Sequence, residues 1–124
     1  NQGLLMTAAT IYMSIMGPEG LERVAALAAQ RTRELVAALT RVKGVRRCFE
    51  GPHFHEAVLT LDRPVAGVLR ELAARGVLGG YDLTEHYPEL GAALLVCATE
   101  TKTAADVDAY AAALSEALRA ARAA

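Results

Sequence analysis

The sequence carries no excess of charge of either sign. Its 13 lysines and arginines nearly balance its 14 aspartates and glutamates, for a formal net charge of −1 at pH 7. Proteins that bind nucleic acid or anionic membranes usually show a basic excess or a basic patch. We therefore expect neither a nucleic-acid partner nor a polybasic membrane contact.

Long hydrophobic runs are also missing. The longest apolar stretch, residues 4–16, is about 13 residues long, whereas a membrane-spanning helix needs roughly 18 or more. The chain has 124 residues and is 53% hydrophobic, enough for one core and too little for two. We expect a soluble, cytoplasmic domain without a membrane partner.

Cysteine and serine are scarce. Cys48 and Cys97 stand alone in strand-like segments, which favours reduced core thiols of a cytosolic protein over a disulfide. The two serines, Ser14 and Ser115, fall inside predicted helices, and no Gly-x-Ser-x-Gly turn exposes a serine nucleophile. The residues thus indicate no nucleophilic serine or cysteine site.

Lysine and histidine are few as well. Lys43 and Lys102 fall at a helix end and in a polar loop, not in the dry or cationic surroundings that activate an imine-forming lysine. His53 and His55 would share one face of a strand and could form a metal site with His86. The Pro52-His53 turn argues against such a site, so the residues alone assign no catalytic, cofactor-binding or metal-binding role.

An apolar helix opens the chain. Residues 4–16 are apolar at nearly every position, interrupted only by Thr7, Thr10, Tyr12 and Ser14. A helix that is apolar all round belongs inside a larger body, because a surface helix keeps a polar stripe. We expect the chain to be a piece of a larger protein, with this helix as an interface through which the isolated piece self-associates.

A second, amphipathic helix follows the first. The sequence Gly17-Pro18-Glu19-Gly20 predicts an interruption and a restart, since proline suits the first helical position. Apolar residues then recur at helical spacing up to Lys43, where Gly44 is placed to take a left-handed cap. We assign residues 1–43 to a helical linker or interface segment.

The remaining residues, 44–124, predict a small α+β domain. Strands are expected at 45–50, 54–62, 77–83 and 92–98, the last being continuously apolar and therefore central. Helices are expected from Pro64 and from Thr103, whose Thr-x-x-Asp spacing is that of a capping box. The order indicates a two-layer sandwich: a small, mostly antiparallel sheet with helices on one face, preceded by the long linker helix.

Two local features leave other interpretations open. Gly79-Gly80 would let the backbone bend or approach another group, and a polar cluster at 99–103 follows the most apolar strand. One alternative is a stand-alone α+β module that binds a ligand or partner without catalysis, with Gly79-Gly80 and Thr99-Glu100 lining its site. Another is a metal-binding domain that uses the three histidines.

Several stretches together resemble one known family. They are Asn1-Gln2-Gly3-Leu4-Leu5, Ile11-Tyr12-Met13-Ser14, Gly17-Pro18-Glu19-Gly20-Leu21, Gly76-Val77-Leu78-Gly79-Gly80, Tyr87-Pro88-Glu89-Leu90 and 94–101. They are similar to the C-terminal part of glycine dehydrogenase (aminomethyl-transferring) subunit 1, the P-protein of the glycine cleavage system in its two-subunit form. The similarity extends over essentially the whole chain.

This resemblance implies the small C-terminal domain of a fold type I pyridoxal-phosphate enzyme. The whole enzyme would decarboxylate glycine and pass the aminomethyl group to the lipoyl arm of the H-protein. Pyridoxal phosphate would be held by a lysine of the second P-protein subunit, so this fragment alone should bind no cofactor and be inactive.

The resemblance also suggests where to look for contacts. Candidate interface or near-site residues are Asn1, Gln2, Tyr87, Thr99 and Glu100. Relatives that act on larger amino acids hold the substrate carboxylate with an arginine near the strand at 94–98, but no arginine occurs between Arg75 and Arg119. The family commonly has Asn-Glu where this chain has His55-Glu56, so the resemblance assigns no role to position 55.

Overall fold

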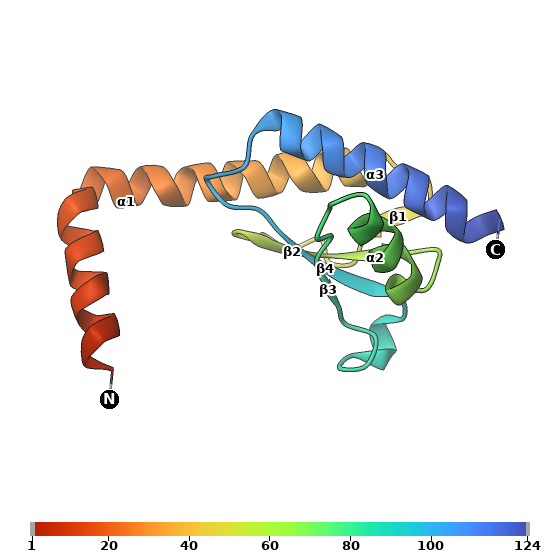
Figure 1. Cartoon of the computed structure of the whole chain (residues 1–124), viewed down its shortest axis with the longest axis horizontal. Helices are drawn as coiled ribbons and strands as arrows, with labels where there is room; N and C mark the ends of the chain where they lie inside the picture. The colour runs from red at the N-terminus through yellow and green to blue at the C-terminus, as the bar shows by residue number, and fades with distance from the viewer. Residues whose placement is uncertain (1, 124) are drawn as a thin grey trace.

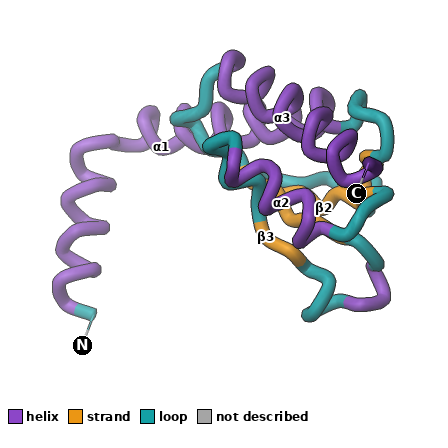
Figure 2. The backbone as a smooth tube through the Cα atoms, turned by 45° about the vertical axis from the view of Figure 1, so that its right-hand side comes forward, coloured by secondary structure: helices purple, strands orange, loops and turns teal. Residues whose placement is uncertain are grey.

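A long kinked helix, α1 (Gly3–Leu39), begins the fold. The computed structural model describes residues 2–123. Gly17 breaks the helical backbone with φ 63° and ψ 179°, directly before Pro18. Glycine tolerates this positive φ, and proline disfavours the helical conformation in the residue before it. The predicted interruption is therefore confirmed, and residues 3–16 form an arm that leaves the rest of α1 in another direction (Figures 1 and 2).

The C-terminal end of α1 differs from the prediction. The helix ends at Leu39 instead of Lys43, and the Thr40 hydroxyl donates a hydrogen bond to the Val36 carbonyl at 2.8 Å. The chain then turns until Gly44, which has the expected positive φ of 96°. A Cβ at Gly44 would collide with the Asp62 carboxylate, so the turn packs closely against the residue that follows β2 (Glu56–Leu61).

Four antiparallel strands form the sheet. Besides β2 they are β1 (Val45–Arg47), β3 (Tyr81–Asp82) and β4 (Ala93–Cys97), in the order β1-β2-β4-β3. The antiparallel sheet and the central position of β4 are confirmed. β3 is much shorter than the predicted strand at 77–83. The Val77 N–H donates to the Leu72 carbonyl at 3.0 Å, so the first of these residues completes a helix end instead of joining the sheet.

Helices cover one face of the sheet. α2 (Val65–Ala74), α3 (Ala104–Ala123) and the second half of α1 pack on that face, while the short 3-10 helix η1 (Pro88–Leu90) lies beyond the strands (Figures 1 and 2). The largest fully buried apolar side chains come from both layers: Leu39, Leu59, Leu72, Leu94, Leu114, Leu118, Val65, Val68 and Val96. No helix among residues 2–123 is long and apolar enough to cross a membrane.

One buried polar side chain joins the two layers. Thr32 of α1 is fully buried, and its hydroxyl donates to the Ala98 carbonyl at 3.1 Å, just after β4. A buried polar group needs such a partner because an unpaired one costs free energy. The bond fixes the second half of α1 over the end of the central strand.

The predicted capping box at α3 is confirmed. The Thr103 N–H donates to Asp106 Oδ2 at 2.7 Å, and the Asp106 N–H donates to the Thr103 hydroxyl oxygen at 3.2 Å. The hydrogen bonds from Thr103 hold the pKa of the Asp106 carboxyl below its usual range. Aspartate therefore does here what glutamate or glutamine does in the common form of this motif.

Removing the threonine of this box should destabilise the domain. We expect Thr103→Ala to lower the free energy of unfolding by about 0.5–2 kcal/mol, because a helix N–H loses its acceptor. Thr101→Ala is the matched control, since within residues 2–123 the Thr101 hydroxyl is hydrogen-bonded only to that of Thr99. Chemical denaturation checks both variants. An unchanged unfolding midpoint in Thr103→Ala would mean that the box does not stabilise α3.

Candidate functional site

A cleft of about 640 Å³ opens between α3, the loop at 76–80 and the end of β4. Its polar lining comes from Arg75, Cys97, Lys102, Asp106 and Tyr110. The structure thus brings Gly79-Gly80 close to the residues that precede α3. Thr99 and Glu100, which the ligand-module interpretation placed at the same site, are half-buried and do not line this cleft.

The loop at 76–80 is hydrogen-bonded to α3. The Tyr110 hydroxyl donates a hydrogen bond to the Gly79 carbonyl from α3. Burial raises the pKa of Tyr110 far above its ordinary value, so this hydroxyl stays protonated and remains a donor. The loop nevertheless exposes one large apolar side chain, Leu78, which is 95% exposed.

The two glycines of this loop are required by close packing. A Cβ at Gly79 would lie 2.5 Å from Leu72 Cδ1, and a Cβ at Gly80, where φ is 134°, would collide with the Leu95 carbonyl oxygen. The sequence indicated that the backbone approaches another group here, and the structure identifies that group as the central strand and α2.

The polar side chains that line the cleft are poorly suited to catalysis. The Asp106 carboxylate is used by the capping box, and Lys102 is exposed to solvent. Burial, and secondarily the nearby Glu56 carboxylate, raises the pKa of the Cys97 thiol, which disfavours the reactive thiolate. Among residues 2–123, the cleft is lined by no nucleophile hydrogen-bonded to a base. The arrangement suits a contact surface better than a catalytic centre.

The prediction of two core thiols is wrong in part. Cys48 and Cys97 are both free, as expected, but Cys48 is half-buried and Cys97 is exposed. Cys97 pairs with Glu56 across the sheet and alternates with the buried Val96 and Ala98. Its side chain therefore points away from the buried core, at the end of β4 that lines the cleft.

Two of the three histidines, His55 and His86, contact aromatic rings. His86 stacks on Tyr81 with ring centroids 5.7 Å apart, and its Nε2 lies 2.7 Å from the Tyr81 hydroxyl. His55 meets the ring of Phe54 edge-on at 4.8 Å. Within the described part of the chain, no three His, Cys, Asp or Glu side chains are arranged to hold a metal ion. The geometry lends no support to the metal-binding interpretation.

The candidate contact residues lie on separate elements. Asn1 is outside the described residues, and Gln2 is exposed at the tip of the arm. Tyr87 is half exposed just before η1, whereas Thr99 and Glu100 lie between β4 and α3. The structure does not bring these residues together into one site.

Sequence reasoning missed the exposed position of Leu78. The available signal was a pair of apolar residues, Val77 and Leu78, enclosed by Gly76 and Gly79 in a segment predicted to be a strand. A strand would have buried or paired such a residue, whereas the loop presents it to solvent.

The arm of α1 is the other unusual surface. Its exposed large side chains are Leu4, Leu5, Met6, Ile11, Tyr12, Met13 and Ile15, with exposed fractions from 48% to 82%. The first charged residue of the chain is Glu19, beyond the kink. An apolar surface of this extent on a small protein indicates an interaction site.

These features define the class of protein. A four-stranded antiparallel sheet, helices on one face and a kinked helix leading away make up the small α+β domain of fold type I pyridoxal-phosphate enzymes.

The chain belongs to the glycine cleavage system P-protein family, whose model matches residues 1–114. It is 56% identical, over 96% of its length, to a Nitrosospira multiformis protein named "Probable glycine dehydrogenase (decarboxylating) subunit 1". A Legionella pneumophila (strain Philadelphia 1) protein of the same name is 56% identical over 90% of this chain.

A solved structure supports the same assignment. A crystal structure of glycine decarboxylase (P-protein) of the glycine cleavage system, in inhibitor-bound form, superimposes with a TM-score of 0.82 and 35% sequence identity. The superposition covers 87% of this chain and 24% of that one. The chain likewise spans only 26% and 24% of the Nitrosospira and Legionella proteins. It therefore corresponds to about a quarter of its relatives.

Replacing the second glycine of the loop should be costly. We expect Gly80→Ala to destabilise the domain by about 1–3 kcal/mol, because alanine is strained at this positive φ and its Cβ meets the Leu95 carbonyl. Gly67→Ala is the matched control, since a Cβ there would make only an ordinary contact with Arg70 Nη2 at 3.9 Å, and alanine favours a helix by about 0.4–1 kcal/mol. The midpoint temperature of thermal unfolding should fall for Gly80→Ala and rise for Gly67→Ala. Equal stability of Gly80→Ala and the unmodified chain would contradict the packing described.

Proposed function

We propose that this chain is the C-terminal domain of subunit 1 of a glycine dehydrogenase. With a second P-protein subunit it decarboxylates glycine and transfers the aminomethyl group to the lipoyl arm of the H-protein. The observation that carries this proposal is the 56% identity, over 96% of the chain, to a protein named as that subunit.

In this proposal the cofactor, pyridoxal phosphate, is held by the second subunit. Lys43 and Lys102 of this chain are both exposed to solvent, so neither offers the enclosed site that an imine-forming lysine needs. When bound, pyridoxal phosphate supplies an electron sink for the charge left as carbon dioxide departs. This chain contributes packing and subunit contacts, and the candidate residues are Asn1, Gln2, Tyr87, Thr99 and Glu100.

Residues 1–43 are proposed to connect residues 44–124 to the larger part of subunit 1, the part of the relatives that this chain does not match. The arm is suited to burial on every side, because its small polar side chains are satisfied internally. The hydroxyls of Thr7, Thr10 and Ser14 donate to the carbonyls four residues earlier, at 3.0, 2.8 and 2.7 Å. Hydroxyls bonded in this way need no water, so an apolar environment costs them little.

The proposed location is the cytoplasm. Two free cysteines, one of them exposed, are typical of a reducing compartment.

Activity should depend on the whole assembly. We expect the full-length subunit, mixed with the second subunit, to decarboxylate glycine in the presence of H-protein. The 124-residue chain alone should show no such activity, and borohydride should leave no stoichiometric pyridoxyl adduct on Lys43 or Lys102. Release of labelled carbon dioxide and mass spectrometry check these expectations. An inactive full assembly, or a stoichiometric adduct on the isolated chain, would overturn the proposal.

The isolated chain should associate through its arm. Each buried side chain of this size is worth about 1.5–3 kcal/mol, so exposed Leu4 and Ile15, three turns apart on one face, favour a dimer or larger assembly. We expect Leu4→Lys with Ile15→Lys to weaken association at least about tenfold in sedimentation experiments. Ala37→Lys, on an exposed part of α1 outside the arm, is the control. A monodisperse monomer with the arm helical and open to water would defeat this expectation.

A further inference from the structure

Leu78 is the most exposed large apolar side chain that the structure describes. Its exposed fraction is 95%, above the 82% of Leu4 in the arm. Beyond the arm, the only other exposed large aliphatic residue among the described side chains is Leu21, at 36%. A single exposed leucine is ordinary on a protein surface, so the surroundings of Leu78 decide whether it has a role.

The backbone on both sides of Leu78 is anchored. The Val77 N–H donates to the Leu72 carbonyl at 3.0 Å, and the Gly79 carbonyl accepts a hydrogen bond from the Tyr110 hydroxyl. A Cβ at Gly79 would lie 2.5 Å from Leu72 Cδ1, so the space beneath the loop is already filled. The exposure of Leu78 therefore results from the way its loop is bonded to α2 and α3, and not from an unattached loop.

Leu78 lies between two hollows of the surface. One is the cleft of about 640 Å³ on the α3 side, and the other, of about 280 Å³, is on the α2 side. Leu78 lines both of them. A projecting apolar side chain with a hollow on either side is a shape that can fit a copy of itself. We call this surface the Leu78 face; its apolar residues are Leu69, Ala73, Val77, Leu78 and Ala109.

The rim of the Leu78 face carries charges of both signs in equal number. Arg70 is exposed on the α2 side and forms no ion pair with any described side chain. The Asp106 carboxylate is exposed on the α3 side, where the capping box holds it. The charged side chains on or beside the two hollows are Arg70, Arg75 and Lys102, and Glu71, Asp106 and Glu116. Two such rims can meet without a net repulsion.

We propose that the Leu78 face binds the same face of a second copy of this chain. A two-fold contact between identical surfaces brings the α2 side of one copy opposite the α3 side of the other. Leu78 of each copy then enters the cleft of the other copy, and Arg70 of each lies opposite Asp106 of the other. The inference concerns how copies of the chain associate, so it does not depend on the proposed enzymatic function.

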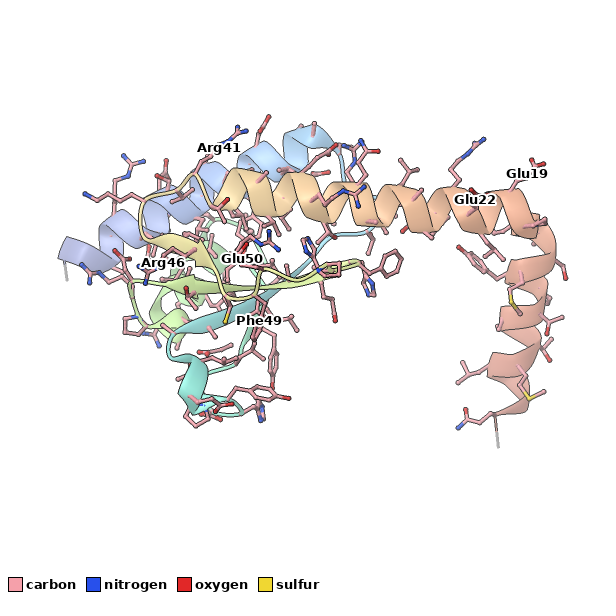
Figure 3. The ribbon with its side chains drawn as sticks, turned by 180° about the vertical axis from the view of Figure 1, so that it is seen from behind. Glu19, Glu22, Arg41, Arg46, Phe49 and Glu50 are labelled. Atoms are coloured by element: carbon pink, nitrogen blue, oxygen red, sulfur yellow. The ribbon has the colours of Figure 1, made fainter. Side chains whose placement is uncertain are left out.

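The distribution of charge favours a second copy over an unrelated charged partner. A surface built for an acidic or a basic partner carries an excess of the opposite charge, whereas the rim of the Leu78 face has no excess. The outer side of α1 is unsuited to a self-contact. Glu19 and Glu22 lie on the side of α1 that faces away from the sheet (Figure 3), and a contact between two copies there would bring their carboxylates together.

The test first removes association through the arm. In the 124-residue chain that carries Leu4→Lys and Ile15→Lys, only the Leu78 face remains available for self-association. We expect sedimentation velocity to show dimers and nothing larger in this background, because a two-fold contact between identical surfaces is closed. Adding Leu78→Lys should raise the dimer dissociation constant at least about tenfold. Ala37→Lys, on an exposed part of α1 outside the Leu78 face, is the matched control and should leave the constant unchanged.

The charged rim is tested separately in the same background. Arg70→Glu places a carboxylate opposite Asp106 of the other copy, so we expect the dissociation constant to rise about threefold at low salt. High salt should remove this difference, because it screens exposed charges. Arg70→Lys keeps the positive charge and is the matched control.

Three results would overturn the inference. One is a background chain that stays monomeric at millimolar concentration, and another is a dimer that Leu78→Lys leaves equally tight. The third comes from the full-length subunit: if Leu78→Lys weakens binding of the second P-protein subunit and leaves self-association unchanged, the Leu78 face belongs to that subunit. Because Leu78 is almost fully exposed, its replacement should not alter the thermal unfolding of the monomer, and this measurement separates a lost contact from a lost fold.

Discussion

The apolar contact of the central strand with the helices is the interaction on which the rest of this structure depends. Leu94 and Val96 of β4 are fully buried beneath helical side chains that include Leu39, Leu72 and Leu114. Because successive strand residues alternate in direction, the same strand must present Leu95 and Cys97 to the other side. One layer of helices satisfies only one face of the sheet. One face of the sheet is therefore buried beneath the helices, and the other face is left uncovered.

Much of the fold could be predicted from local patterns. The kink at Gly17-Pro18, the capping box of Thr103 and Asp106 and the central position of β4 all follow from residues close together in sequence. Three other features could not be predicted in this way: where α1 ends, how short β3 is, and that Cys97 is exposed. They depend on contacts between residues that are far apart in the sequence. The candidate site shows the same division. The Gly79-Gly80 pair predicted a close approach of the backbone to another group. The hydrogen bond from the Tyr110 hydroxyl to the Gly79 carbonyl could not be predicted in this way, because the two residues are 31 positions apart in the sequence.

Among residues 2–123, the structure arranges no side chains as a metal site and lines the cleft with no nucleophile hydrogen-bonded to a base. The cleft near Gly79 is lined by Cys97, whose thiol pKa is raised, and by Asp106, whose carboxylate is already used for capping. The most extensive exposed surfaces of the protein are apolar. In the function proposed above, this domain contributes by packing and by subunit contacts. The relatives that it matches are about four times its length.

The central claim is that the sheet and its helices form a self-sufficient core, while the arm needs the rest of the protein. Hydrogen–deuterium exchange tests this most directly, with a dilute monomeric sample of the 124-residue chain compared with the complete two-subunit enzyme. The account predicts that amides of β4 are protected in both samples and that those of residues 6–16 are protected only in the enzyme. Equally rapid exchange of the arm in the complete enzyme would contradict it.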